Sequence, residues 1–161
     1  MNNRLTFTRR SLLAGMAVMP MFSAPLLAQT SELPLVTVNK DPSCGCCAAW
    51  AEHLKAAGFP VTVVETADLQ GVKQRLGVPA ELASCHTAEV AGYVIEGHVP
   101  APALQRLLSE RPSATGLAVP GMPAGSPGME VPGVAPERYD VVLFGPAARA
   151  TFARFLGAKE L

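Results

Sequence analysis

The sequence predicts a single α/β domain, because short apolar strand patterns alternate with helical patterns through the first half of the chain. Its 161 residues have room for one ordinary domain, and two independent cores would be crowded. Hydrophobic residues make up 49% of the chain and charged residues 16%, which excludes a disordered chain. The 13 basic and 13 acidic residues cancel, so the net charge indicates no nucleic-acid partner.

The first half of the chain is predicted to run strand, helix, strand, helix. An apolar strand pattern covers residues 35–39, and a helical pattern follows over about 46–57, with a glycine directly after it. A second strand is predicted over 61–65, and Thr66 is a plausible N-cap for a helix that runs to about residue 76. This order favours parallel pairing of the two strands.

The second half is predicted to contain a strand over 89–96, a helix over 100–108 and a strand over 139–144. Six prolines and five glycines fall within residues 112–136, which are therefore predicted to form a long irregular loop. Residues 149–155 fit either the returning strand of a hairpin or a short helix.

Residues 1–28 differ from the rest in composition and are predicted to be a signal peptide. Basic residues precede the apolar run 12–22, no acidic residue is present, and the pair Arg9 and Arg10 resembles the twin-arginine export signal. An ordinary secretion signal is the alternative. The apolar run has about half of the ~20 residues that a spanning helix needs, so no stable membrane anchor is expected after cleavage. The mature domain, residues 29–161, is expected in the periplasm.

Removing the leader changes the composition of what remains. Three of the 13 basic residues are lost against none of the 13 acidic ones, which leaves a mildly acidic domain. Four of the six methionines are lost as well, and only Met122 and Met129 stay. All four cysteines and all three histidines belong to the mature domain, so its soft metal-binding side chains are few and their positions are informative.

Cys44, Cys46 and Cys47 place three thiols within four residues, at the junction of the first strand and the first helix. The amino end of a helix favours the thiolate, which is both a metal ligand and a redox nucleophile. Purely structural disulfides fit poorly, because neighbouring cysteines pair only with strain and only Cys85 lies elsewhere.

Two active interpretations use these thiols differently. Cys44 and Cys47 are a C-x-x-C pair opening a helix, as in thioredoxin-like thiol-disulfide oxidoreductases. Cys46 weakens that interpretation, since a third adjacent thiol would trap or scramble a two-thiol couple. Three clustered thiolates suit a soft multinuclear centre, for which Cu(I) is favoured and zinc or iron–sulfur clusters are competitors.

Further candidate ligands lie in loops. Cys85 and His86 are adjacent, just before the strand predicted over 89–96, and would complete a ligand set with the other cysteines. His98 follows that strand and is either a ligand or a turn residue. His53 lies two turns into the first helix and is expected on its solvated face.

Both methionines of the mature domain lie in similar proline- and glycine-rich settings. Methionine usually fills a core, but such a loop offers little core to fill. Thioether ligation of copper fits this placement, with Met122 slightly favoured over Met129.

Several motifs, taken together, resemble the CopG-like family of periplasmic copper-resistance proteins. They are Cys44-Gly45-Cys46-Cys47 with Trp50, and residues 82–87, 92–100, 116–123 and 126–130. The resemblance covers about residues 35–155, and residues 145–149 match least because they lack the expected Asp/Gly-rich turn. Many members of this family are labelled only as metal-binding proteins or as a domain of unknown function.

The resemblance implies a thioredoxin-like fold for residues 29–161 and a cysteine-bridged multinuclear copper cluster. The ligands that it implies are Cys44, Cys46, Cys47 and Cys85, with His86 and Met122 as additional ones. The implied function is copper resistance outside the cytoplasm, by sequestration, by cycling between Cu(I) and Cu(II), or by transfer to other periplasmic copper-resistance proteins.

Overall fold

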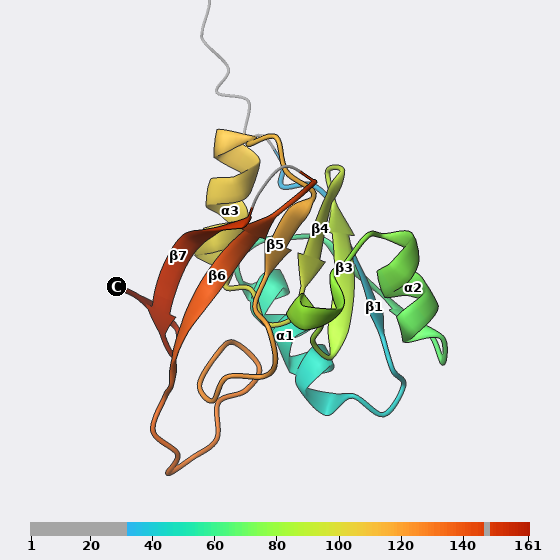
Figure 1. The fold of residues 1–161 in the computed structure, drawn as a ribbon. Coiled ribbons are helices and arrows are strands. Elements are labelled where there is room, and N and C mark those ends of the chain that lie inside the picture. Colours follow the sequence, from blue (N-terminus) through green and yellow to red (C-terminus); the bar gives the residue numbers. More distant parts are fainter. Residues whose placement is uncertain (1–31, 147–148) are drawn as a thin grey trace, which may run out of the picture. The chain divides into compact units, whose positions relative to one another are not determined.

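The computed structural model describes residues 32–146 and 149–161, so the predicted signal peptide lies outside the described residues. An α/β domain is confirmed: an eight-stranded mixed sheet in the order β2-β1-β3-β4-β5-β6-β7-β8, with three α-helices (Figure 1). None of the helices in this described part is long and apolar enough to cross a membrane.

The first half follows the predicted order. β1 (Val36–Lys40) leads through a short loop to α1 (Gly45–Ala56), and β2 (Val61–Glu65) returns parallel to β1 before α2 (Leu69–Arg75). The predicted N-cap at Thr66 is wrong by two residues.

The residue that caps α2 is Asp68, whose carboxylate accepts a hydrogen bond of 2.9 Å from the Gly71 amide. Thr66 instead accepts a hydrogen bond of 3.1 Å from the Asp68 amide, one step earlier in the turn. Both residues can accept from backbone amides through a side-chain oxygen, so the sequence pattern did not distinguish them.

The single strand predicted over 89–96 is wrong. The structure has a hairpin of β3 (His86–Val90) and β4 (Tyr93–Glu96), which follow the short 3₁₀ helix η1 (Ala80–Leu82). Its turn residues Ala91 and Gly92 both have positive φ, +48° and +86°, which tightly reverses the chain. A hairpin here turns His86 into a strand residue.

The remaining elements agree more closely with the sequence. α3 (Ala101–Glu110) matches the predicted helix, and β6 (Arg138–Phe144) and β7 (Arg149–Leu156) form the hairpin that was one of two alternatives for the chain end, followed by β8 (Lys159–Glu160). The long loop is interrupted by one strand that composition did not predict, β5 (Gly116–Ala118).

β5 pairs parallel with β4 and antiparallel with β6, and so joins the two parts of the sheet. Its approach to β4 requires glycine at position 116, because a Cβ there would collide with the Val94 carbonyl. The proline- and glycine-rich segment 112–136 therefore contains a short central strand as well as a long loop.

Helices cover the two faces of the sheet unequally. α1 and α3 pack on one face, where Trp50, Leu54, Leu104 and Leu107 join the larger hydrophobic core. A smaller core around Leu82 lies on the face that carries η1 and the end of α2. The carboxyl ends of β1 and β4 meet the amino end of β3 at one end of the sheet, where Lys40 pairs with His86.

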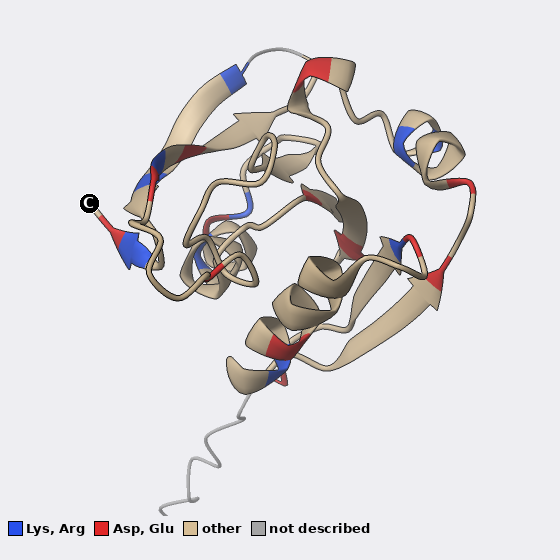
Figure 2. Ribbon diagram, turned by 90° about the horizontal axis from the view of Figure 1, so that it is seen from below, with Lys and Arg blue, Asp and Glu red and all other residues tan. Residues whose placement is uncertain are grey.

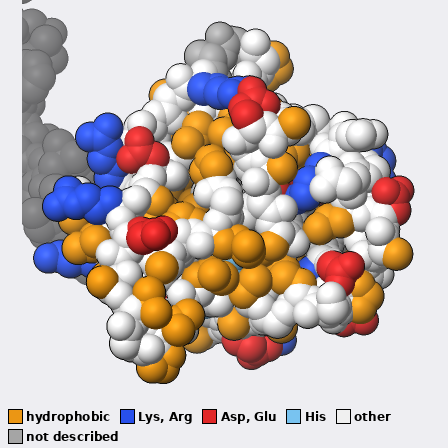
Figure 3. Space-filling model, turned by 60° about the horizontal axis from the view of Figure 1, so that its bottom comes forward, with side chains coloured by type: hydrophobic (Ala, Val, Ile, Leu, Met, Phe, Trp, Pro, Cys, Tyr) orange, Lys and Arg blue, Asp and Glu red, His pale blue; other side chains and the backbone are white. Residues whose placement is uncertain are grey.

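Acidic and basic residues are interspersed over the described ribbon (Figure 2). Figure 3 turns the bottom of the molecule forward and shows hydrophobic side chains across the centre of the face, with charged ones mainly around the rim. Met122, Val131 and Val134, all in the long loop, are more than half exposed.

Candidate metal centre

The first turn of α1 carries three of the four cysteines. Cys44 is the N-cap residue and makes no side-chain capping bond, while Cys46 and Cys47 belong to the first turn. Cys44 and Cys47 form a disulfide, with their Cα atoms 5.5 Å apart, and Cys46 and Cys85 are free thiols. The disulfide joins the two cysteines that the C-x-x-C interpretation paired.

The structure brings the fourth cysteine to the same place. The Cys46 sulfur lies 3.5 Å from the Cys44 sulfur and 3.8 Å from the Cys85 sulfur. All four sulfur atoms lie within 4.8 Å of one another, although Cys85 is 38 residues beyond Cys47. Cys46 therefore lies between the helix-borne pair and the cysteine that precedes β3.

Two histidines adjoin this cluster through Cys85. The Cys85 sulfur lies 3.3 Å from His86 Nδ1 and 3.0 Å from His98 Nε2. His98 Nδ1 is 2.8 Å from the carbonyl oxygen of Pro127, which only accepts hydrogen bonds. Nδ1 therefore carries the hydrogen, and Nε2 directs its lone pair toward Cys85.

Burial keeps both imidazoles in the form that binds metals. His86 and His98 are 0% exposed, and burial lowers the pKa of His98 and lowers that of His86 well below the usual value, with smaller contributions from His98 and Lys73 to the latter. Both rings are then neutral at pH 7, as metal ligation requires. His86 Nε2 has no hydrogen-bond partner among the described residues.

The pKa of the Cys85 thiol is raised, whereas the pKa of a reactive cysteine is lowered. Burial, with the neighbouring Cys46, raises the pKa of Cys85 to about 12. Without a metal this thiol keeps its proton, and a bound soft cation would displace the proton to form the thiolate. Metal binding at Cys85 is thus coupled to proton release.

Trp50 supports the buried side of the cluster. Its ring centroid is 4.4 Å from that of His86, and its indole Nε1 donates a 2.9 Å hydrogen bond to the Val99 carbonyl. These contacts connect α1 to β3 and to the segment that follows β4, so the helix and the histidines are held against each other.

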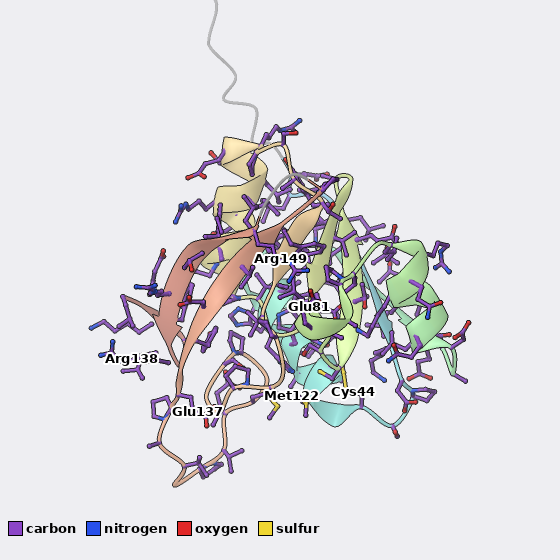
Figure 4. The ribbon with its side chains drawn as sticks, in the orientation of Figure 1. Cys44, Glu81, Met122, Glu137, Arg138 and Arg149 are labelled. Atoms are coloured by element: carbon purple, nitrogen blue, oxygen red, sulfur yellow. A yellow bond between two sulfur atoms is a disulfide. The ribbon has the colours of Figure 1, made fainter. Side chains whose placement is uncertain are left out.

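Besides the Pro127 carbonyl at His98, the long loop has two further contacts beside the cluster. Ser84 donates a hydrogen bond from its hydroxyl to the Gly121 carbonyl. Gly128 contacts α1 so closely that a Cβ would lie 2.7 Å from the Cys46 carbonyl oxygen. Met122 and Met129 directly follow these two glycines; Met122 is exposed and Met129 half-buried, and Figure 4 shows Met122 and Cys44 at the same lower end of the molecule.

The sequence pattern predicts His53 on a solvated helix face, and this prediction is wrong. The side chain is half-buried, and its Nε2 accepts a 3.1 Å hydrogen bond from the Ala101 amide at the start of α3. His53 thus accepts a hydrogen bond from the first turn of α3 although it belongs to α1, and a contact between two helices leaves no local sequence signal. The buried ion pair of Lys73 with Glu96 was also not predicted from the sequence. Glu96 contacts Ser84, the residue before Cys85.

These features define a class of protein: an α/β domain with four sulfurs and two imidazoles gathered at one end of its sheet, a group that could hold a soft metal ion. The donor set fits copper, because thiolate, imidazole and thioether are the ligands that copper favours, whereas magnesium and calcium favour carboxylate oxygens.

The comparisons with known proteins agree with this class. The family described as protein of unknown function, DUF411, matches residues 82–129. Two solved structures, described as copper resistance protein CopG in forms 2 and 1, are each 44% identical to this chain, with TM-scores of 0.73 and 0.72. The aligned regions cover 77% and 78% of this chain and 99% and 100% of those chains. No curated protein matches.

The chain belongs to the family of the CopG copper resistance proteins. The predicted resemblance is therefore confirmed.

Proposed function

We propose that this protein binds several copper ions in a multinuclear thiolate cluster and thereby contributes to copper resistance. The observation that carries the proposal is the convergence of four sulfur atoms within 4.8 Å of one another. Four sulfurs already suffice for one tetrahedral ion, and two neighbouring imidazoles add to them, so the donors exceed what a single ion requires. Thiolate sulfurs can in addition bridge several Cu(I) ions.

The ligands would come from both sides of the centre. Cys44, Cys46 and Cys47 supply thiolates from α1, and Cys85 supplies the thiolate that faces them. Additional ligands are drawn from the two buried histidines and the loop methionines: His86, Met122, His98 and Met129.

The Cys44–Cys47 disulfide adds a redox condition to copper loading. Two electrons and two protons convert it to two thiols, and only then are all four sulfurs available. Copper held here would be sequestered, cycled between Cu(I) and Cu(II), or passed to other periplasmic copper-resistance proteins.

The same disulfide favours a second candidate function, thiol-disulfide exchange through Cys44 and Cys47. Its position at the amino end of α1 is the position that activates such a pair. A zinc or iron–sulfur centre would use the same sulfurs and is a further outcome that the experiment below distinguishes.

The proposal extends to the fold and the cellular location. β1, α1, β2 and the β3–β4 hairpin would form a thioredoxin-like core to which β5–β8 are added, and the parallel β1–β2 pair beside an antiparallel hairpin supports this. The leader of residues 1–28 would direct a folded protein to the periplasm by the twin-arginine route.

Anaerobic loading of the reduced mature protein, followed by metal analysis, tests the function. We expect more than one copper per chain in the wild type and a large loss in Cys46→Ala, while Ala49→Ser, on the exposed face of the same helix, keeps the wild-type content. If the wild type takes up no copper and Cys46→Ala retains dithiol reductase activity, the oxidoreductase function is correct instead. Preferential retention of zinc or iron would identify the third possibility.

A further inference from the structure

Glu96, the last residue of β4, is a carboxylate enclosed by the protein. It is 0% exposed and accepts hydrogen bonds from the Lys73 ammonium, from the Ser84 amide at 2.6 Å and from the Thr87 hydroxyl at 2.7 Å. Lys73, on α2, is 3% exposed and also donates to Thr87 at 2.9 Å. The two charges therefore pair with each other, and Glu96 is hydrogen-bonded to both ends of the short segment 84–87.

That segment contains two candidate metal ligands. Ser84 directly precedes Cys85, and Thr87 directly follows His86, so Glu96 holds the backbone on both sides of the ligand pair. Side chains alternate across a strand. Thr87 consequently points to the α2 face, where Glu96 lies, and His86 points to the opposite face, where Trp50 lies.

Ser84 extends the same connection to the long loop. Its amide is bound by Glu96, and its hydroxyl donates to the carbonyl of Gly121, the residue before Met122. Gly97 permits the close approach, because a Cβ there would lie 2.5 Å from the Ser84 hydroxyl oxygen. One buried carboxylate is thus linked to Cys85, to His86 and to the backbone beside Met122.

We infer that Glu96, paired with Lys73, is the positioning residue of the metal centre, an inference that rests on the proposed function. Hydrogen bonds to groups around the ligands fix ligand geometry, and their loss commonly costs 10–100-fold in metal affinity. An apolar pair of similar volume is often as stabilising for a fold as a buried ion pair. What apolar side chains cannot supply is the acceptor that holds the Ser84 amide.

Two double variants separate the acceptor from the charge. Lys73→Met with Glu96→Gln removes both charges but keeps an amide oxygen for Ser84 and an NH₂ group for Thr87. Lys73→Met with Glu96→Leu removes the charges and the acceptor together. Neither variant leaves an unpaired buried charge, so both are expected to fold.

The measurement is Cu(I) affinity, by anaerobic competition with a chromophoric Cu(I) chelator. The leucine variant should bind Cu(I) about 10–100-fold more weakly than the glutamine variant, which should stay near the wild type. Tyr93→Phe is the control for stability alone: it removes a 2.9 Å hydrogen bond to the Pro112 carbonyl, at the opposite end of β4 from Glu96, and should leave the affinity unchanged. Equal Cu(I) affinities of the two double variants would overturn the inference.

Amide hydrogen exchange in the metal-free protein gives a readout that does not depend on copper. Residues 84–87 should exchange faster in the leucine variant than in the glutamine variant, while β1 keeps its protection. Unchanged exchange over 84–87 contradicts the positioning role. If the wild type binds no Cu(I), the proposed copper function fails by itself, and hydrogen exchange still decides whether Glu96 positions this segment.

Discussion

The two sides of the candidate metal centre are built in different ways. At the start of α1, three cysteines are neighbours in the sequence, Cys44 and Cys46 are half-buried, and a disulfide joins Cys44 to the buried Cys47. On the strand side, His98 comes from beyond the β3–β4 hairpin to meet the adjacent Cys85 and His86, and both histidines are fully buried.

The helix side carries the groups that can react, and the strand side is the more rigid one. The helix side carries the sulfurs that can change their bonding, because Cys46 lies within 4 Å of both Cys44 and Cys85. The strand side is fixed by hydrogen bonds to Glu96 and Pro127 and by the packing of Trp50. In the proposed site, sulfurs whose bonding can change therefore face a side that is fixed by hydrogen bonds, and three experiments test this difference.

The largest expected effect is loss of stability in acid, and it should arise mainly from the strand side. Burial lowers the pKa of His53, His86 and His98 in the folded protein. The unfolded chain then takes up protons below about pH 6.5 before the folded chain does, so the stability present above that pH is lost as the pH falls through the depressed values. Urea unfolding of the metal-free protein at pH 7.5, 6.5 and 5.5 measures this.

The three histidines can be distinguished by substitution. His86→Gln should remove the largest share of the acid dependence, because burial lowers the pKa of His86 well below its usual value and lowers those of His53 and His98 less. His53→Gln is the matched control outside the candidate site and should retain most of the dependence. Urea midpoints that do not change with pH in the wild type would show that these rings are not held neutral.

An intermediate effect is expected where the long loop meets α1. Gly128→Ala should destabilise the protein by roughly 1–3 kcal/mol, because the residue has φ of +86° and its Cβ would lie 2.7 Å from the Cys46 carbonyl oxygen. Gly45→Ala is the control on the same helix: no atom lies within 4 Å of its Cβ, and alanine favours a helix by about 0.5–1 kcal/mol. Thermal unfolding compares them, and equal stability of Gly128→Ala and the wild type would rule out the close loop contact.

The smallest effect concerns the exposed thioether. Met122→Leu should change stability by less than about 0.5 kcal/mol, since the side chain is 54% exposed, yet weaken Cu(I) binding about tenfold, or ~1.4 kcal/mol. Met129→Leu tests the alternative ligand under identical conditions. A larger loss of Cu(I) affinity in Met129→Leu would reverse the order in which the two methionines were favoured.

The regular elements could be predicted from the sequence where their signal is local. The strand, helix, strand, helix order of the first half comes from hydrophobic periodicity and turn residues within each segment. The β3–β4 hairpin could not be predicted in this way, because Ala91 adopts a positive φ that alanine rarely adopts. β5 was missed for the reverse reason: its glycine is required by a neighbouring strand, not by its own conformation.

Residues of the candidate site could likewise be predicted only where their signal is local. The three cysteines of residues 44–47 are neighbours in the sequence, as are Cys85 and His86, and these residue types are chemically distinctive, so both groups could be predicted as candidates. His53 was misplaced because its partner is the amide of Ala101, which lies in another helix. Glu96 carried one weak signal, an acidic residue that ends the apolar run Val94-Ile95, but its partner Lys73 is 23 residues away.

By itself, the sequence determined the soft character of the candidate ligands, the thiol cluster at a helix start and the basic composition of residues 1–28, because these depend on residue type and on neighbours in the chain. Only the tertiary structure decided which distant groups complete the centre. Strand pairing places Cys85 against α1, burial makes the histidines neutral, and a buried carboxylate ties the ligand segment to the methionine loop. Such contacts depend on desolvation and on hydrogen bonds between remote segments, and local sequence patterns contain neither.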